Sequence, residues 1–321
     1  MDSLDVGPVA AGVRLPWADV PEALHGWVEA FLGSPVVQAQ TQPGGFSPGV
    51  AARLRCADGS RAFVKAVSSL ANPRSPDMHR AEARIGGRLP TSAPVPRLLA
   101  SYDDGTWVAL LFADVDGRQP ALPWRADELD RVLRALAEMA ELLTPSPLPE
   151  LPTVVERLAE DFTGWRLLAG GGTPANGLDA WSRRHLDRLA QLETLSLEAA
   201  SGETLLHCDL RADNLLLEAV TDRVWVVDWP WACRGAAFVD IVAFAPSVAM
   251  QGGPPPEEVL DLSAGSGSDP AGVDAVLCGL AGLFTERSLR PASPGLPTLR
   301  AFQAAQGRVA RAWLARRTGW A

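Results

Sequence analysis

The sequence is nearly devoid of lysine. Its 321 residues include 28 arginines but a single lysine, Lys65, and asparagine, isoleucine and tyrosine are also scarce. This composition indicates a GC-rich genome, in which a surface lysine is easily replaced by arginine. A lysine that persists indicates a site that needs a compact ammonium, because the planar guanidinium has a different shape. The alternative, that Lys65 is the one lysine left by chance, stays open on composition alone.

Long apolar runs and paired cysteines are also missing. No stretch of 18 or more apolar residues occurs, so we expect no membrane-spanning helix. The chain starts with no basic region followed by an apolar run, so we expect no secretory signal. The four cysteines are widely spaced and form no C-x-x-C pair, which predicts neither a zinc site nor a disulfide framework. Together these features favour the reducing cytoplasm, and they leave the oligomeric state open.

The net charge of −9 argues against a nucleic-acid partner. The charge is unevenly distributed, since residues 1–112 hold 10 basic and 10 acidic side chains whereas residues 113–321 hold 19 and 28. A negative second half favours a cationic substrate. The same carboxylates also suit a surface that is merely kept soluble.

A hairpin is predicted in the first third of the chain. Two alternating runs, Val50–Cys56 and Arg61–Val67, flank an Asp-Gly turn, and Lys65 lies in the middle of the second run. The glycine-rich segment 42–49 precedes the hairpin, and glycines between two strands let backbone N–H groups approach phosphates closely. It does not match G-x-G-x-x-G, so a plain turn is the alternative. The candidate nucleotide-contacting residues of this segment are Gly44, Gly45, Phe46 and Ser47.

A helix is predicted over residues 75–86. Met78, Glu82 and Ile85 fall on one face of it, so that a carboxylate lies within an apolar stripe. A buried charge needs a partner, and Lys65 lies 17 residues upstream on a strand that this helix could cover. Lys65 and Glu82 therefore resemble the lysine–glutamate pair of kinases. The alternative is that Glu82 lies at the edge of the stripe and reaches water.

The order of the elements predicts an α+β fold with two lobes. Strands are expected over residues 95–102 and 106–112, a linker follows at 113–117, and the pattern then becomes helical. We therefore divide the chain into a β-rich nucleotide-binding lobe with one helix, residues 1–112, and a mainly helical catalytic and substrate-binding lobe, residues 113–321. Segments 144–152 and 251–272 are rich in Pro, Gly and Ser and are predicted to be loops.

The most informative segment runs from Leu205 to Leu217. His207, Asp209 and Asn214 match the pattern H-x-D-x-x-x-x-N, and a strand, a polar turn and a second strand that ends at Asp228 follow. Asn214 and Asp228 offer the oxygen ligands that Mg²⁺ prefers. Asp209 would accept a hydrogen bond, and then the proton, from a substrate hydroxyl, while Lys65 would hold the α- and β-phosphates of a nucleotide.

Each of these residues also has a structural interpretation. Asp209 and Asn214 are residue types that favour turns. We interpret His207 as a packed residue that braces the loop, Asp240 as a residue that caps or braces the segment after Asp228 rather than a metal ligand, and Asp213 as an exposed loop carboxylate. The structural alternatives would all have to hold together and in order, so the sequence favours phosphoryl transfer.

The same residues carry a family resemblance. The run from His207 to Asn214, then Val226-Val-Asp-Trp-Pro-Trp231 and the segment from Gly235 to Asp240, resembles the aminoglycoside phosphotransferase family over roughly residues 40–245. The resemblance implies a bilobal, protein-kinase-like fold, a catalytic aspartate at position 209, magnesium ligands at 214 and 228, and nucleotide binding by Lys65. The expected cofactors are ATP, with GTP as the alternative, and Mg²⁺.

Two departures from known patterns bear on the substrate. Cys208 stands where the family commonly has glycine, and no A-P-E follows Asp228, which disfavours a protein substrate. Three hypotheses remain: a kinase of a small-molecule hydroxyl such as that of an aminoglycoside-type antibiotic; a metabolic kinase resembling those for choline, homoserine, fructosamines or macrolides; and a catalytically silent nucleotide-binding module. The last is disfavoured because a silent module would not need Lys65, Asp209 and both metal ligands.

Overall fold

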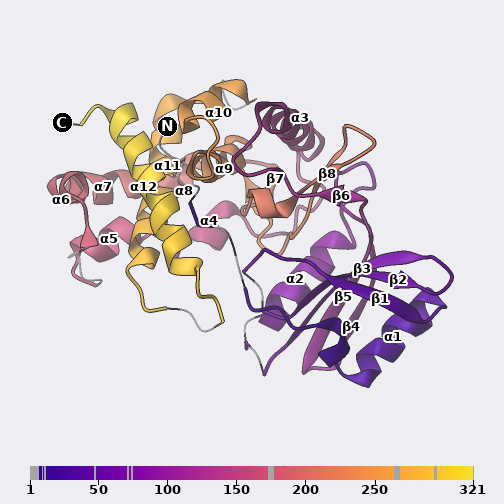
Figure 1. The fold of residues 1–321 in the computed structure, drawn as a ribbon. Helices are drawn as coiled ribbons and strands as arrows, with labels where there is room; N and C mark the ends of the chain where they lie inside the picture. Colours follow the sequence, from indigo (N-terminus) through magenta and orange to yellow (C-terminus); the bar gives the residue numbers. More distant parts are fainter. Residues whose placement is uncertain are drawn as a thin grey trace, which may run out of the picture.

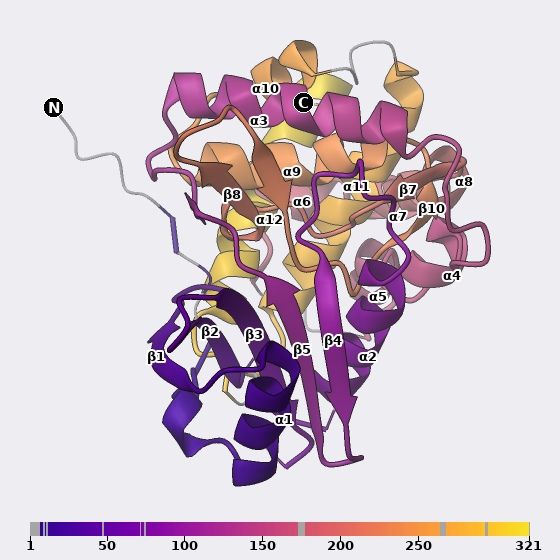
Figure 2. The same ribbon diagram turned by 90° about the vertical axis from the view of Figure 1, so that its right-hand side faces the viewer.

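The computed structural model describes residues 7–8, 10, 12–46, 48–70, 72–73, 75–172, 177–263, 268–292 and 295–320. These residues form a smaller lobe built on an antiparallel sheet and a larger lobe that is mainly helical, which lie one against the other in Figures 1 and 2. The expected α+β, bilobal architecture is therefore confirmed, although the smaller lobe has a second helix, α1 (Glu22–Leu32), beside the one that was predicted. No helix in this described part of the chain combines the length and the apolar character needed to cross a membrane.

The smaller lobe contains a five-stranded sheet with the strand order β1-β2-β3-β5-β4 and all neighbours antiparallel. The predicted hairpin is its centre, with Gly59 at the turn in a left-handed conformation (φ 87°). The elements are η1 (Trp17–Asp19), α1 (Glu22–Leu32), β1 (Val36–Thr41), β2 (Val50–Cys56), β3 (Arg61–Ser68), α2 (Ser75–Gly86), β4 (Leu98–Asp103) and β5 (Trp107–Ala113).

The alternation of side chains along β3 determines which face of the sheet carries the chemistry. Ala62, Val64 and Ala66 point to one face, where they pack in a single apolar cluster with Leu24 and Val28 of α1. Because successive side chains of a strand alternate between faces, Lys65 points to the opposite face, which carries α2. The sheet thus places its one lysine between a helix and the second lobe.

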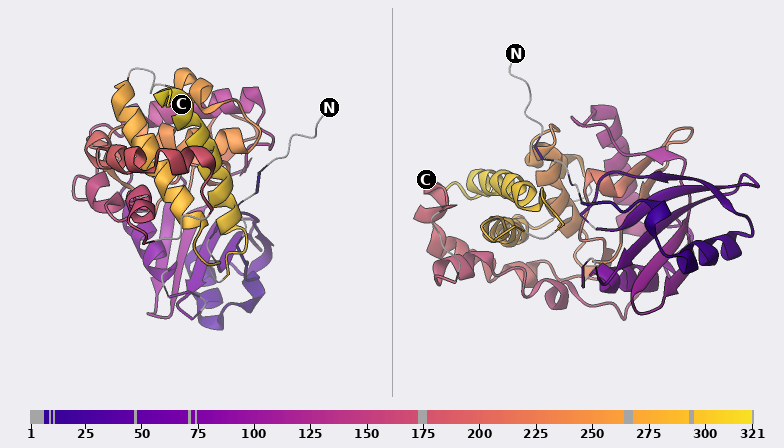
Figure 3. Two further views of the ribbon diagram at one scale, coloured as in Figure 1. Left: turned by 90° about the vertical axis from the view of Figure 1, so that its left-hand side faces the viewer. Right: turned by 60° about the horizontal axis from the view of Figure 1, so that its bottom comes forward.

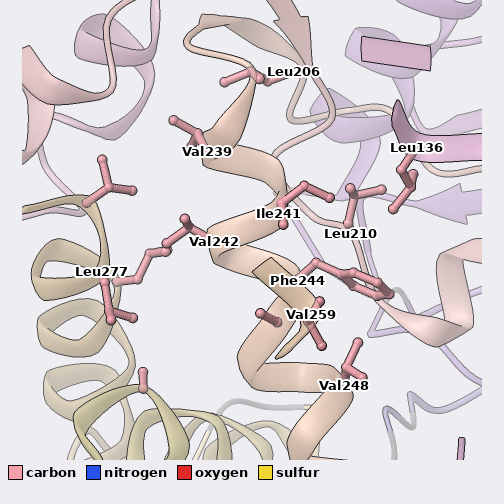
Figure 4. Close-up of a cluster of buried hydrophobic side chains, with 14 of the residues drawn as sticks. Leu136, Leu206, Leu210, Val239, Ile241, Val242, Phe244, Val248, Val259 and Leu277 are labelled. Carbon is pink, nitrogen blue, oxygen red and sulfur yellow. The ribbon is translucent and has the colours of Figure 1, made fainter. Parts of the chain in front are cut away.

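The larger lobe is built around the buried helix α9, which Figure 4 shows at the centre of its core. Helices α11 and α12 pack side by side on it, as Figure 3 shows from two further directions. The elements are β6 (Gly117–Arg118), α3 (Ala126–Leu142), α4 (Val154–Leu158), α5 (Gly164–Ala169), α6 (Ala180–Arg184), α7 (Leu186–Glu193), α8 (Ser196–Ala199), β7 (Thr204–Leu206), η3 (Ala212–Asn214), β8 (Leu215–Glu218), β9 (Val224–Val226), β10 (Cys233–Gly235), α9 (Phe238–Met250), α10 (Pro256–Leu262), α11 (Pro270–Ser288) and α12 (Leu299–Thr318).

One prediction for this lobe was wrong. Within the segment 251–272, expected to be a loop, residues 256–262 form the helix α10. Pro256 occupies the first turn of this helix, where the missing N–H has no partner to lose, and two glutamates follow in that turn. Val259 and Leu260 are buried in the core. Proline thus starts a helix here, and composition alone could not distinguish this position from a loop.

The core of this lobe also anchors the segment that carries the H-x-D-x-x-x-x-N pattern. Leu206 and Leu210 are buried in the same apolar cluster as Val239 and Ile241 of α9. Figure 4 shows them lying along that helix. The residues between these two leucines, 207–209, are therefore held between two buried anchors.

Candidate active site

Lys65 lies at the centre of an ion-pair network between the lobes. Its Nζ donates to Glu82 Oε1 and Oε2 at 2.8 and 2.9 Å, and to Asp228 Oδ1 at 2.8 Å. The structure thus brings together the strand lysine, the helix glutamate and the aspartate at the end of the second motif. The contact between Lys65 and Glu82 follows from the sequence pattern, whereas the contact with Asp228 spans 163 residues and was not expected.

Burial and charge act in opposite directions on this network. Burial alone would lower the pKa of Lys65, but the Asp228 and Glu82 carboxylates together raise that pKa above its ordinary value. Burial would likewise raise the pKa of Asp228, yet the Lys65 ammonium holds it well below its usual range. Both groups are therefore charged at neutral pH, as an ion pair in a desolvated site requires.

Asp240 holds the backbone of the loop that carries the H-x-D-x-x-x-x-N pattern, residues 207–214. Its Oδ2 accepts from the His207 N–H and its Oδ1 from the Cys208 N–H, both at 2.8 Å. His207 is fully buried, its Nδ1 accepts from the Asp209 N–H at 3.2 Å, and its Nε2 lies 2.9 Å from the Val227 carbonyl oxygen. Burial lowers the pKa of His207 to about 4. The neutral ring with its proton on Nε2 therefore links the two motifs. His207 braces the loop as expected, whereas Asp240, which was expected to brace the segment after Asp228, holds the loop at His207 and Cys208 instead.

Two residues of the site adopt a left-handed backbone. Cys208 (φ 63°) and Asp228 (φ 72°) are the non-glycine residues with positive φ in the described part of the chain. This conformation is uncommon for residues with a Cβ and occurs most often where surrounding structure imposes it. Glycine adopts a positive φ at no steric cost, which gives a physical reason for the glycine that the family resemblance led us to expect at the position of Cys208.

Asp209 and Asn214 lie next to each other at the end of the loop. The Asn214 Nδ2 donates to the Asp209 carbonyl oxygen at 2.8 Å and lies 3.3 Å from its Oδ2. Arg211 Nη1 donates to Asp209 Oδ1 at 2.5 Å. Burial raises the pKa of Asp209 to about 7, while the charge of Arg211 limits the rise. The carboxylate is thus held in one orientation by an arginine that the sequence left without a definite role.

The interpretation of Asp213 as an exposed carboxylate was wrong. Its side chain is 11% exposed, and its two oxygens accept from Nε and Nη2 of Arg211 at 3.0 Å each. Arg211 therefore joins Asp209 to Asp213 across the loop. The Arg211 backbone is extended (φ −153°, ψ 163°) just before η3, and its side chain contacts the carboxylates two residues before and two residues after it. The sequence shows the i, i+2 spacing of the charges but not that conformation.

A cavity of about 380 Å³ lies between the lobes and collects most of the predicted site residues. Gly44, Gly45, Lys65, Glu82, Asn214 and Asp228 all line it. Its apolar walls come from both lobes and include Val50, Phe63, Val95, Phe112 and Leu216. A pocket with apolar walls at one part and convergent charges at another suits a nucleotide, whose base is flat and apolar and whose phosphates are charged.

The other three predicted residues are Asp209, which lies beside Asn214 but does not line the cavity, Phe46 and Ser47. The ring of Phe46 packs edge-to-face on Phe302 of α12, with centroids 5.2 Å apart, and lies 5.2 Å from the Arg211 guanidinium. Its side chain therefore covers the catalytic loop from the glycine-rich turn and does not line the cavity. Ser47 lies outside the described residues.

Comparison of the sequence with known families gives one match, to the phosphotransferase enzyme family over residues 41–276, about three quarters of the chain. The chain belongs to this family. The match includes the Lys65 network and both motifs of the larger lobe, and it makes the protein an enzyme that transfers a phosphoryl group to a hydroxyl of a small molecule. No curated protein matches the sequence closely enough to be counted as a relative.

Solved structures of the same fold include three small-molecule kinases. The aminoglycoside phosphotransferase APH(4)-Ia, in a complex with ADP and hygromycin B, is 13% identical with a TM-score of 0.64, over 93% of this chain and all of the other. Spectinomycin phosphotransferase in complex with ADP and its antibiotic, and choline kinase LicA from Streptococcus pneumoniae, are 12% and 11% identical, both with a TM-score of 0.56 over 92% of this chain and 98% of theirs. At these identities the likeness establishes the fold.

The oxygen donors of the phosphotransferase cavity fit a magnesium ion. Asp228 is held in its ionised form by Lys65, and the Asn214 amide uses its nitrogen on Asp209, which leaves its oxygen as the remaining polar atom. A carboxylate and an amide oxygen are ligands that Mg²⁺ accepts, and it commonly completes its shell with phosphate oxygens and water. Within the described residues no group of three or more His, Cys, Asp or Glu side chains is arranged to hold a metal.

Replacing Asp240 with asparagine is expected to loosen the catalytic loop. The amide offers one oxygen, so one of the two N–H groups that Asp240 accepts would face an NH₂ group instead. A lost hydrogen bond to a charged group costs about 1.5–3 kcal/mol. We expect a loss of stability of that size in urea unfolding, together with slower turnover. An unchanged unfolding midpoint would contradict this role, and Glu258→Gln on the surface of the same lobe is the control.

Proposed function

We propose that this phosphotransferase uses ATP and Mg²⁺ to transfer the γ-phosphate to a hydroxyl group of a small molecule. One observation carries the proposal: the network of Lys65, Glu82 and Asp228 lies in the same cavity as Asn214, which contacts Asp209. Phosphoryl transfer needs the nucleotide held in place and its charge neutralised beside a group that receives the hydroxyl proton. With the division between the lobes at residues 112 and 113, the smaller lobe holds the nucleotide and the larger lobe supplies the group that receives the proton.

Each residue then has one task. Lys65, held by Glu82, contacts the α- and β-phosphates, and the backbone of Gly44 and Gly45 approaches the phosphates from above. Asn214 and Asp228 hold Mg²⁺, which supplies positive charge to the phosphates when it is bound. The adenine base occupies the apolar part of the cavity.

Asp209 acts on the acceptor. Its carboxylate accepts a hydrogen bond from the substrate hydroxyl and takes the proton as the hydroxyl oxygen bonds to the γ-phosphorus. The bond from that phosphorus to the β-phosphate oxygen breaks, and ADP is the leaving group. Arg211 holds one carboxylate oxygen at 2.5 Å, which fixes the direction of the group. Because burial raises the pKa of Asp209 to about 7, the carboxyl is a stronger base than an exposed aspartate.

The acceptor we favour is a cationic small molecule such as an aminoglycoside-type antibiotic, which would make the enzyme a resistance factor. The excess of 28 acidic over 19 basic residues after position 112 supports a cationic acceptor. The neighbours of the same fold were solved with hygromycin B and spectinomycin, and another is a choline kinase. A reaction that consumes ATP is expected in the cytoplasm, where four free cysteines would stay reduced.

A phosphorylation screen over antibiotics and hydroxylated metabolites tests the acceptor. Transfer of labelled phosphate to a cationic antibiotic supports the favoured acceptor. Transfer to choline or another metabolic alcohol replaces it with a metabolic kinase. The absence of any transfer, with nucleotide binding intact, would leave a catalytically silent module.

Binding of Mg-ATP is expected to stabilise the fold strongly. A ligand present at 100 times its dissociation constant adds about 2.7 kcal/mol, which raises the melting temperature by several degrees for a chain of this size. A thermal melt with millimolar Mg-ATP measures the shift, and EDTA should reduce it. No shift with either Mg-ATP or Mg-GTP would count against the proposed nucleotide site.

A further inference from the structure

The segment before the first helix runs along the edge of the nucleotide cavity. Leu15 N–H donates to the Gly49 carbonyl at 3.0 Å, and Gly49 N–H donates to the Val13 carbonyl at 3.3 Å, so that Arg14 forms a parallel bridge with Gly49. Val13 N–H also reaches the Gly295 carbonyl of the larger lobe at 3.4 Å. Both lobes therefore hold the backbone at Arg14, and the bridge places it beside the end of the glycine-rich segment 42–49.

The side chain of Arg14 turns into the cavity. Its Nη2 donates to the carbonyl oxygen of Gly44, and a Cβ added to Gly45 would lie 2.8 Å from the same nitrogen. Arg14 lines the cavity together with Lys65 and Asp228. The backbone bridge to Gly49 holds the segment, and the guanidinium reaches past that bridge into the cavity.

At this position along the cavity, Arg14 lies near the loop that carries Asp209 and Asp213. A Cβ on Gly44, the residue that Arg14 contacts, would lie 3.7 Å from the Asp213 Cβ. Asp213 is paired with the arginine that holds Asp209. Burial lowers the pKa of Arg14, while the carboxylates of Asp228 and Asp213 raise it. A guanidinium stays charged under such conditions, so a second cation faces this end of the cavity.

We propose that Arg14 binds the terminal phosphate of the nucleotide and positions it for transfer. The transferred phosphoryl group must lie beside Asp209 and Asn214, because the acceptor hydroxyl is held there. Arg14 stands at this end of the cavity, whereas Lys65 lies on the sheet between Glu82 and Asp228. The forked donors of a guanidinium match the oxygens of a phosphate group. This assignment rests on the proposed function, since it presupposes that the cavity holds a nucleoside triphosphate.

Comparing a triphosphate with a diphosphate isolates this contact. We would measure the affinities of AMP-PNP and ADP, each with Mg²⁺, by calorimetry for the wild type, Arg14→Gln and Arg55→Gln. Arg55 is an exposed arginine on β2 with no part in the cavity, so it is a matched control. Charge-assisted contacts to phosphate are strong, so we expect Arg14→Gln to weaken AMP-PNP binding by about 10- to 100-fold. ADP binding should change by less than about 3-fold, since ADP lacks the group that Arg14 contacts.

The ratio of the two affinities distinguishes the loss of one contact from a general loss of structure, because a general loss of structure weakens the binding of both ligands alike. Arg14→Lys keeps the charge and should recover part of the AMP-PNP affinity, and in steady state Arg14→Gln should raise the KM for ATP. Equal losses for both ligands, or an unchanged ratio, would overturn the inference. A wild type that binds neither nucleotide would instead refute the proposed function, and the inference with it.

Discussion

Asp209→Asn is expected to lower kcat by about 10²–10⁴-fold, the range that general-base assistance supplies, while Mg-nucleotide binding survives. The variant keeps the shape of the side chain but removes the carboxylate that receives the hydroxyl proton. Asn214 Nδ2 donates to the Asp209 backbone carbonyl at 2.8 Å, a bond that the substitution leaves in place, and to Asp209 Oδ2 at 3.3 Å, where an amide oxygen could still accept. Steady-state kinetics with an accepted substrate, or basal ATPase activity in its absence, measures the loss, and calorimetry with Mg-ATP checks binding.

The control for this variant has to lie outside the loop. Asp213 is unsuitable because its carboxylate pairs with Arg211, which in turn holds Asp209. Asp130 is an exposed aspartate on α3, so Asp130→Asn should be nearly silent. Normal turnover in Asp209→Asn would show that another group receives the proton and that the motif has been assigned the wrong role.

Lys65→Arg is expected to reduce kcat/KM by about 10²-fold, the size of loss that a small misplacement of reacting groups produces. The Nζ atom lies within 2.8–2.9 Å of three carboxylate oxygens, and the side chain is 15% exposed, so the space is shaped for an ammonium. The larger planar fork keeps the charge but shifts the position from which it meets the phosphates. Kinetics at varied ATP gives the loss, and a thermal melt shows whether the fold survives.

Charge conservation makes this a test of shape. The ion pairs with Glu82 and Asp228 can still form in the variant, so we expect the melting temperature to change much less than the activity. Arg55→Lys, the reverse exchange at an exposed position of the neighbouring strand, is the control and should be silent. Wild-type turnover in Lys65→Arg would mean that Lys65 persists in this arginine-rich chain without a functional reason.

The sequence by itself determined the features that depend on neighbouring residues. The alternation around Asp58-Gly59 predicted β2, the turn and β3, because a period of two and a turn signal are both local. The helical period placed Glu82 on the apolar face of α2, and burial of a carboxylate required a cation. The spacing of His207, Asp209 and Asn214 indicated phosphoryl transfer, since the chemistry restricts which residue types can serve.

Only the tertiary structure decided how distant segments meet. The bond from Lys65 to Asp228, the packing of Phe46 on Phe302 and the entry of Arg14 into the cavity join parts of the chain that share no periodic pattern. Asp213 was misjudged for a related reason: its partner Arg211 reaches it only because the backbone between buried leucines is held in one conformation. A sequence shows which charges exist, but their partners are set by the packing of a core to which residues from the whole chain contribute.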